Sequence, residues 1–154
     1  MNRKIIPSFV FILSFFIYSC GFTPQYAGFK NLEFDLIINE VSGDRDFNNQ
    51  IKSQIKRYDR NRDNAEKIKI SYNSSYKKII LSKNTKGEAT KYNLKVNVIF
   101  NVEFENNSKE IIFNDEFKID KIDDTIEENN YIKIVKRNFA ERAIEKLILS
   151  IRED

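Results

Sequence analysis

Apolar and polar residues alternate along the middle of the chain, and this pattern predicts a sheet of long strands. The clearest alternation covers residues 91–105, and shorter stretches cover residues 32–38, 67–81 and 111–119. Successive side chains of a strand point to opposite faces, so each segment has one apolar and one polar face. The residues expected on the apolar face are Leu32, Phe34, Leu36, Ile38, Ile68, Ile70, Tyr72, Tyr76, Ile80, Tyr92, Leu94, Val96, Val98, Phe100, Val102, Phe104, Ile111, Phe113, Phe117 and Ile119.

Two other segments repeat apolar residues at steps of three or four, which is the spacing of amphipathic helices. The first follows the turn and N-cap residues 42–44 and ends near Tyr58. The second runs from about residue 129 to residue 151 and follows an acidic linker, residues 120–128. Their apolar residues are Phe47, Ile51 and Ile55 in the first, and Ile132, Val135, Phe139, Ala143, Leu147 and Ile151 in the second.

The predicted order of elements is therefore β-α-β-β-β-α, with polar turns at residues 82–88 and 106–109. Strands with a single apolar face need cover on that face only, and the two amphipathic helices can supply it. We expect an α+β two-layer sandwich, in which a four-stranded, mostly antiparallel sheet has both helices on one face. Residues 31–154 would form this single domain, with polar residues on its other face.

Residues 1–19 have the pattern of a secretory signal peptide, with a basic start and an apolar stretch from Ile5 to Ile17. Cys20, the only cysteine in the chain, follows Ser19 directly, as in the lipobox of bacterial lipoproteins. We expect cleavage before Cys20, which would carry a diacylglycerol group and an N-acyl chain. Residues 20–30 would then be a lipidated tether. Gly21 occupies the position where an inner-membrane retention signal usually has Asp, so we expect the anchor to lie in the outer membrane.

Two other interpretations of this segment are less consistent with the pattern. A lone cysteine is often a small buried hydrophobe, but Cys20 lies at the end of a leader rather than in an apolar face. An uncleaved membrane anchor would need about 20 apolar residues to span a bilayer. The stretch from Ile5 to Ile17 is shorter than that.

The composition excludes several kinds of catalytic and metal site. The chain has no histidine and one cysteine, so it cannot form a Ser-His-Asp or Cys-His site or a His/Cys zinc site. Four glycines, in no phosphate-binding motif, leave little for nucleotide loops. We expect no enzyme activity, no metal and no cofactor besides the acyl chains on Cys20. A periplasmic enzyme that uses a carboxylate pair is the remaining catalytic alternative.

Charge is unevenly distributed along the chain, although the formal net charge is only +3. Residues 67–95 contain eight lysines and one acid, Glu88, whereas residues 96–130 contain ten acids and three lysines. The first region attracts anions and the second repels them. The lysines expected to contact an anionic lipid are Lys83, Lys86 and Lys91 at the turn, with Lys77 and Lys78 behind them. A solvated hairpin, protected by its charges against edge pairing, is the alternative, and nucleic-acid binding is not expected outside the cytoplasm.

The chain resembles the LPS-assembly lipoprotein family LptE, in its alphaproteobacterial form. The resemblance lies in the start of the mature chain, Cys20-Gly21-Phe22-Thr23-Pro24-Gln25-Tyr26, and in the central hairpin, which runs from Ser82 to Leu94 and contains the Lys86-Gly87 turn and Tyr92-Asn93-Leu94. The order of strands and helices and the length of the mature chain are also similar.

This resemblance implies a lipid-anchored protein on the periplasmic side of the outer membrane. It would plug the lumen of the β-barrel LptD, help the barrel to assemble, bind lipopolysaccharide and assist its delivery to the outer leaflet. A lipid-anchored adaptor of another envelope complex, such as an ABC-type lipid exporter, is the alternative. It would share the anchor and the fold but have a different partner.

Overall fold

The computed structural model describes residues 34–58, 65–104 and 107–153, and its elements follow the predicted order. The α+β prediction is therefore confirmed, whereas Cys20, the tether and Leu32 lie outside the described residues. The elements are β1 (Phe34–Gly43), α2 (Arg45–Ile55), β2 (Glu66–Lys83), β3 (Ala89–Glu103), β4 (Ser108–Asp120) and α3 (Thr125–Arg152).

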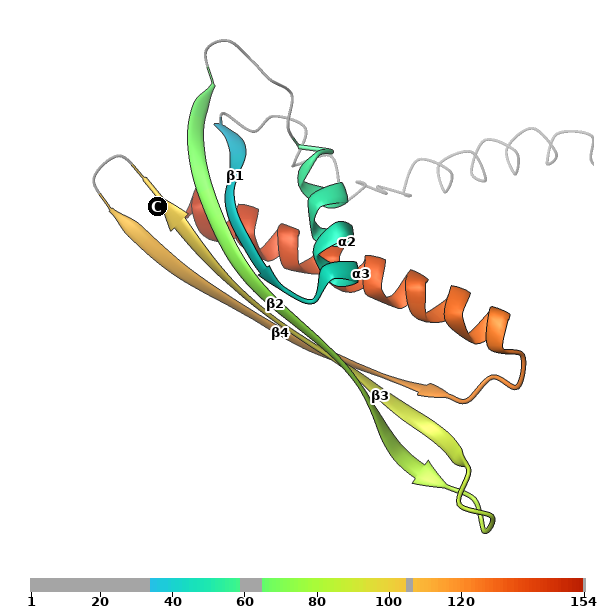
Figure 1. The fold of residues 1–154 in the computed structure, drawn as a ribbon. Helices are drawn as coiled ribbons and strands as arrows, with labels where there is room; N and C mark the ends of the chain where they lie inside the picture. The colour runs from blue at the N-terminus through green and yellow to red at the C-terminus, as the bar shows by residue number, and fades with distance from the viewer. Residues whose placement is uncertain (1–33, 59–64, 105–106, 154) are drawn as a thin grey trace, which may run out of the picture. The chain divides into compact units, whose positions relative to one another are not determined.

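The four strands form one mixed sheet in the order β1-β2-β3-β4 (Figure 1). The β2–β3 and β3–β4 pairs are antiparallel and are joined by short turns, whereas β1 is parallel to β2. Parallel neighbours need a crossover connection, and α2 lies in the connection between β1 and β2. The prediction of a mostly antiparallel sheet is confirmed.

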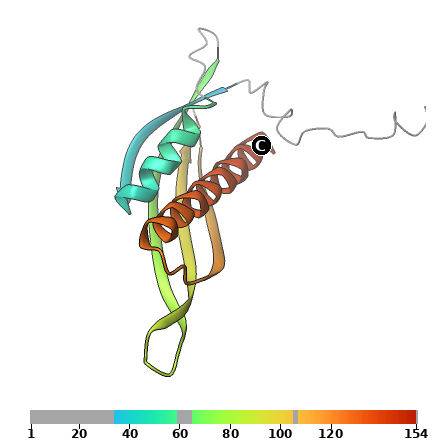
Figure 2. The same cartoon turned by 90° about the vertical axis from the view of Figure 1, so that its right-hand side faces the viewer.

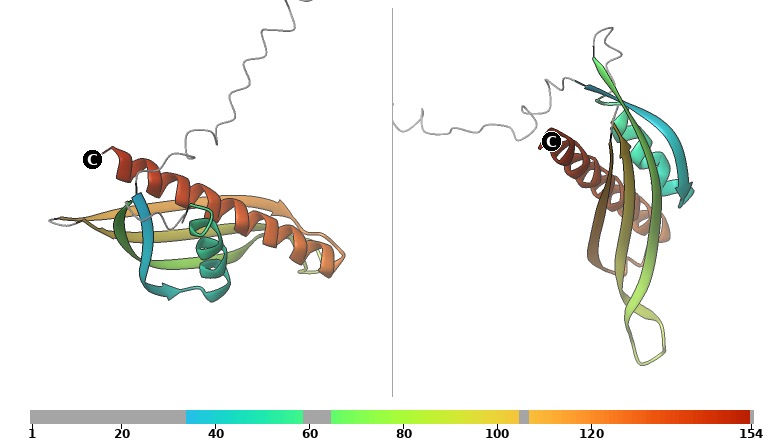
Figure 3. Two further views of the ribbon diagram at one scale, coloured as in Figure 1. Left: turned by 90° about the horizontal axis from the view of Figure 1, so that it is seen from above. Right: turned by 90° about the vertical axis from the view of Figure 1, so that its left-hand side faces the viewer.

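Both helices cover the same face of the sheet, and the other face has no helix on it in the described part of the chain (Figures 2 and 3). The even-numbered residues of β3 from Leu94 to Val102 are buried beneath the helices. The largest fully buried side chains are Phe47, Ile51 and Ile55 of α2, Ile70 of β2, Leu94, Val98, Phe100 and Val102 of β3, and Phe139, Ile144, Leu147 and Ile148 of α3. The core is therefore the single apolar layer that the two periodicities predicted.

Helix α3 begins at Thr125, earlier than the predicted start near residue 129. Of the acids that suggested a linker, Asp120 ends β4, Asp124 is the N-cap of the helix, and Glu127 and Glu128 lie in its first turn. The Asp124 carboxylate accepts hydrogen bonds from the backbone N–H of Ile126 and Glu127, at 2.7 and 2.9 Å, and caps the helix. Acidic residues are favoured there because they cap free N–H groups and because their negative charge is attracted to the positive end of the helix dipole.

The hairpin formed by β2 and β3 extends beyond the layer of helices (Figures 1 and 2). Two residues predicted to be buried, Tyr76 and Ile80, lie on the helix face of this outer region, and a third, Phe117, lies on the edge strand β4. Tyr76 is half-buried there, while Ile80 and Phe117 are 48% and 42% exposed. Their predicted orientation is correct and their predicted burial is wrong, because strand periodicity reports the face of a residue but not how much of that face the helices cover.

Strand β1 ends at Gly43, which lies opposite Ser74 of β2. Gly43 has a φ of +96°, and a Cβ atom there would lie 1.8 Å from the Ser74 carbonyl oxygen. The same carbonyl accepts a hydrogen bond from the N–H of Asp44, at 2.9 Å, and the Asp44 carboxylate caps α2 at Phe47. This close approach ends the β1–β2 pairing, so β2 continues past Ser74 without β1.

Candidate functional site

The outer part of the β2–β3 hairpin, residues 75–91, is the candidate site, and we call it the basic hairpin. The side chain of Asn84 bridges its turn by hydrogen bonds. Asn84 Oδ1 accepts hydrogen bonds from the backbone N–H of Lys86 and Glu88, both at 3.0 Å. Asn84 Nδ2 donates to the Glu88 carboxylate at 2.7 Å. Gly87 has a φ of +85°, in the left-handed region that glycine tolerates. The only acid of residues 67–95 is thus bonded to Asn84.

Four of the five lysines predicted from the sequence are exposed on the turn or on the uncovered face. Lys83 and Lys86 lie at the turn, and no carboxylate pairs with either among the described residues. Lys77 and Lys91 lie on the strands, on the face opposite the helices. Lys91 pairs with Asp120 of β4 at 3.2 Å. Both side chains are mostly exposed, so this ion pair is weak.

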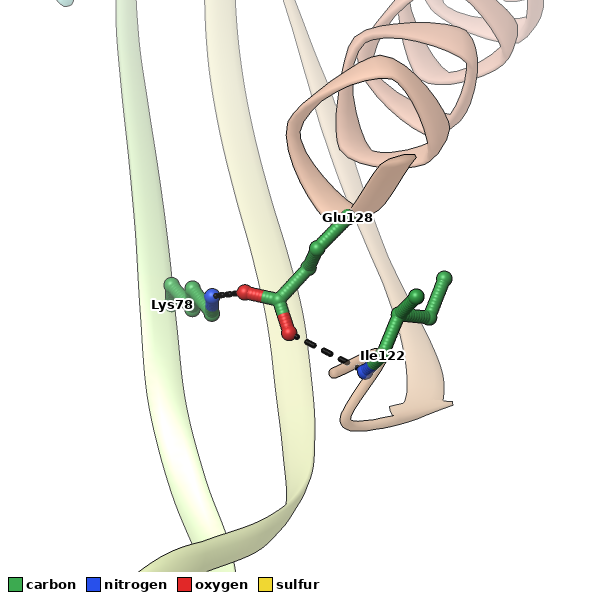
Figure 4. A network of polar contacts seen from close by, with 3 residues as sticks. All are labelled: Lys78, Ile122 and Glu128. Carbon is green, nitrogen blue, oxygen red and sulfur yellow. Dashed lines mark hydrogen bonds and ion pairs between the residues drawn. The ribbon is translucent and has the colours of Figure 1, made fainter. Parts of the chain in front are cut away.

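Lys78 is separated from the other four because its side chain lies on the helix face. Its Nζ donates a hydrogen bond to Oε1 of Glu128 in the first turn of α3, at 2.5 Å (Figure 4). The same Nζ lies 3.8 Å from the centre of the Tyr92 ring. The second oxygen of Glu128 accepts from the N–H of Ile122, at 3.2 Å. The hydrogen bond from Lys78 lowers the pKa of Glu128 below its ordinary value.

The basic hairpin also carries three consecutive exposed apolar residues, which are not among the lysines predicted for the site. Ile79, Ile80 and Leu81 are 41%, 48% and 46% exposed. Ile80 pairs with Tyr92 and Ser82 pairs with Lys91, so Leu81 is the extra residue of a β-bulge. The signal in the sequence was the break in alternation, since three successive apolar residues cannot all face one side of a strand.

The uncovered face of the sheet is polar and bonded within itself, as the alternation predicted. Asn97 of β3 donates to Asn114 of β4 at 2.7 Å. Glu116 of β4 accepts from Asn93 at 3.0 Å and pairs with Lys95 at 2.9 Å. The Lys95 hydrogen bond lowers the pKa of Glu116, with Asn93 adding to the effect. Such a face is stable in contact with water or with another polar surface and needs no apolar cover.

The basic hairpin therefore combines unneutralised ammonium groups with apolar side chains at the end of an extended arm. This combination suits an amphiphile that has both anionic groups and hydrocarbon. In the described part of the chain, no cluster of three or more acidic, histidine or cysteine residues could hold a metal ion. No helix of the described residues is long and apolar enough to cross a membrane.

Comparison with known proteins supports the fold but does not identify a family. No protein-family model matches the chain, and no curated protein matches it. Among solved structures, rare lipoprotein B from Shewanella oneidensis is similar, with a TM-score of 0.53 and 13% identity over 75% of this chain and 98% of that one. Lipoprotein B from Nitrosomonas europaea has a TM-score of 0.45 and 13% identity over 73% and 81% of the two chains. At this identity the first likeness establishes a shared fold.

Proposed function

We propose that this chain is a lipoprotein of the outer membrane that plugs the LptD β-barrel and assists lipopolysaccharide transport. The observation that carries the proposal is the two-sided sheet, with helices on one face and a polar, internally bonded face on the other. A plug inside a barrel meets a polar lumen, and the Asn97–Asn114 face is suited to such a wall. The lipobox at Cys20 supplies the anchor, and the resemblance of the hairpin sequence to LptE supplies the partner.

The basic hairpin is proposed to contact lipopolysaccharide. Lipid A has phosphates and acyl chains, which match the ammonium groups of Lys83 and Lys86 and the exposed Ile80 and Leu81. Flexible lysines attract phosphates by charge without needing a fixed geometry. Lys77 and Lys91 would extend this contact on the uncovered face, whereas Lys78 can join it only by sharing or leaving Glu128. No catalytic step is proposed, because binding and support of a partner account for every feature of the site.

The decisive experiment is a pull-down of the tagged, full-length protein from its native membranes in mild detergent, followed by mass spectrometry. We expect one large outer-membrane β-barrel in a ratio near 1:1. Cys20→Ala is the matched variant for anchoring, and its product should leave the outer-membrane fraction. Recovery of an inner-membrane ATPase complex would instead support the adaptor alternative. Retention of the Cys20→Ala protein in outer membranes at the wild-type level would refute the anchoring proposal.

Lipid contact is tested separately by charge reversal of Lys83, Lys86 and Lys91 to Glu. This variant should lose most binding to purified lipopolysaccharide while it still recovers the barrel. The control reverses three exposed basic residues on the helices, Lys52, Lys133 and Arg137, and therefore changes the net charge equally. Equal binding by the folded hairpin variant and the wild type would remove the hairpin from the lipid site. Equal losses in both variants would show a non-specific charge effect.

A further inference from the structure

We infer that the outer edge of β2, from Tyr76 to Ile80, receives an extended, acidic segment of another protein as an added strand. Past Ser74 no described strand pairs with β2 on the side where β1 ends. A strand without a neighbour presents unpaired N–H and C=O groups, and such an edge can bind a strand from a partner.

The orientation of the backbone identifies the residues that would bind. The Ser74 carbonyl oxygen points away from β3, because it accepts the N–H of Asp44 at the end of β1. In an antiparallel pair the backbone groups of successive residues point alternately toward and away from the neighbour. Tyr76, Lys78 and Ile80 therefore point their N–H and C=O groups to the free edge, up to the bulge at Leu81. A length of about five residues is enough for an ordinary strand.

The exposed edge of β4, by contrast, is blocked. Lys146 of α3 donates to the backbone carbonyl of Ile112 at 2.7 Å. The Asp115 carboxylate accepts the backbone N–H of Glu116 at 2.8 Å and is itself held by Arg142 at 2.7 Å. Side chains thus occupy donors and acceptors that a partner strand would need there.

The edge of β1 is interrupted as well. Its pairing with β2 shifts between Ile38 and Val41, which marks a bulge in the strand. Bulges twist an edge strand away from further pairing. In the outer half of β2, no described side chain bonds to the edge backbone groups of the segment from Tyr76 to Ile80. The segment also has no bulge before Leu81.

The charges on the uncovered face indicate what the partner segment carries. Lys77 of β2 lies directly opposite Lys95 of β3, and Lys95 lies opposite Glu116 of β4. Like charges opposite one another destabilise a sheet, and Glu116 compensates Lys95 by an ion pair of 2.9 Å. Among the described residues no carboxylate pairs with Lys77. An acidic residue on the added strand, beside Lys77, would compensate Lys77 as Glu116 compensates Lys95.

The same charges disfavour a second copy of this chain as the occupant. Residues 75–83 contain Lys77, Lys78 and Lys83 and no acid. Pairing of two such edges would place a second set of lysines beside the first. Lysine on an edge strand is a known means of preventing self-association, and it leaves the edge open to a partner of opposite charge.

Hydrogen–deuterium exchange tests the backbone contact directly. The full-length protein is compared in two forms in the same detergent: with the partner retained from native membranes, and expressed in a host that lacks the partner. In the complex, the amides of Tyr76, Lys78 and Ile80 should exchange at least about tenfold more slowly. Amides at the β1 edge, such as Ile37, serve as the internal control and should change little. Equal exchange of the three amides in both forms would overturn the inference.

A photo-crosslinking side chain at position 77 identifies the occupant. We expect a crosslink to a segment of another protein with an Asp or Glu beside the crosslinked residue. A crosslink to lipopolysaccharide alone, without any to another protein, or a crosslink to a second copy of this chain would overturn the inference. The same crosslinker at position 69, on the same strand and face but between β1 and β3, is the control and should give no such product.

Two substitutions at Ile80 separate the backbone from the side chain. Ile80→Pro removes an N–H that points to solvent, which edge strands tolerate, whereas Ile80→Ala keeps the N–H and removes most of the side chain. We expect at least about a tenfold loss of the crosslink at position 77 in Ile80→Pro and near wild-type yield in Ile80→Ala. Equal losses would show that side-chain packing carries the contact. The result does not depend on which protein is the partner, so it is independent of the barrel proposal.

Discussion

Lys78 on β2 and Glu128 on α3 form an ion pair across the two layers, with Nζ and Oε1 2.5 Å apart (Figure 4). The pair ties the base of the basic hairpin to the start of α3. Glu128 also accepts the N–H of Ile122, so its carboxylate joins β2 to the connection between β4 and α3. This lysine has a structural partner, whereas Lys83 and Lys86 at the turn have none among the described residues.

Glu128→Gln should lower the free energy of unfolding by about 0.5–1 kcal/mol near pH 7, because the ion pair is only partly shielded from solvent. The pKa of Glu128 is lowered in the folded state. Its contribution is therefore present above the ordinary glutamate pKa and is lost as the pH falls through the folded value. Urea denaturation at a series of pH values from 7 downward should show a difference between variant and wild type that is largest at pH 7 and shrinks as the pH falls.

The control for this prediction is Asp120→Asn, which removes the exposed ion pair with Lys91. It should change the free energy of unfolding by less than about 0.5 kcal/mol. A larger loss in Asp120→Asn than in Glu128→Gln would contradict the structural role assigned to Lys78.

Phe139→Ala should destabilise the protein by about 3–5 kcal/mol, because the ring is fully buried between the layers and its removal leaves a cavity. Phe117 was also predicted to be buried but is 42% exposed. Phe117→Ala should therefore cost about 1 kcal/mol or less. Chemical denaturation of the two variants measures the difference. Similar losses would show that the Phe117 ring is also buried in solution.

Gly43→Ala should strongly destabilise the fold, by more than about 3 kcal/mol, because a Cβ atom would collide with the Ser74 carbonyl. Gly87 also has a positive φ, but a Cβ atom there would meet nothing within 4 Å. Gly87→Ala should then cost only the backbone strain, about 1 kcal/mol. Thermal unfolding of both variants tests this, and equal shifts in Tm would contradict it.

Stability should also fall at alkaline pH. Burial raises the pKa of Tyr72 to about 12, so the folded state keeps the hydroxyl protonated after the unfolded chain, with an ordinary pKa of 10.0, has ionised. The contribution of Tyr72 is fully present below pH 10 and is lost as the pH rises from 10 to about 12. Tyr72→Phe should reduce this alkaline loss in denaturation curves, with Tyr131→Phe, at a 38% exposed residue of α3, as the control. An unchanged pH dependence in Tyr72→Phe would contradict the burial of its hydroxyl.

The fold could be predicted from the sequence because its main signals are local. Alternation in β3 and the helical spacing around Phe139 each assign residues to a face, and both faces were assigned correctly. The start of α3 was missed by several residues, since an acidic run is compatible both with a linker and with a capped first turn. Only the geometry of Asp124 distinguishes the two.

The candidate site could be predicted only in part. The lysines of the hairpin were visible as a run of charge, but their separation was not, because the face that a strand residue occupies says nothing about its partner on another element. Lys78 lies on the helix face of the sheet and bonds there to Glu128 of α3, which lies 50 positions away in the sequence.

The sequence by itself thus determined the order of elements, the apolar layer and the polar face, because these follow from side-chain periodicity within each segment. The tertiary structure decided where β1 stops, which part of the hairpin has no cover and which lysine is neutralised. These features depend on contacts between distant segments, such as Gly43 with Ser74 and Lys78 with Glu128. The free edge of β2 belongs to the same class, since it exists only because its neighbour ends early.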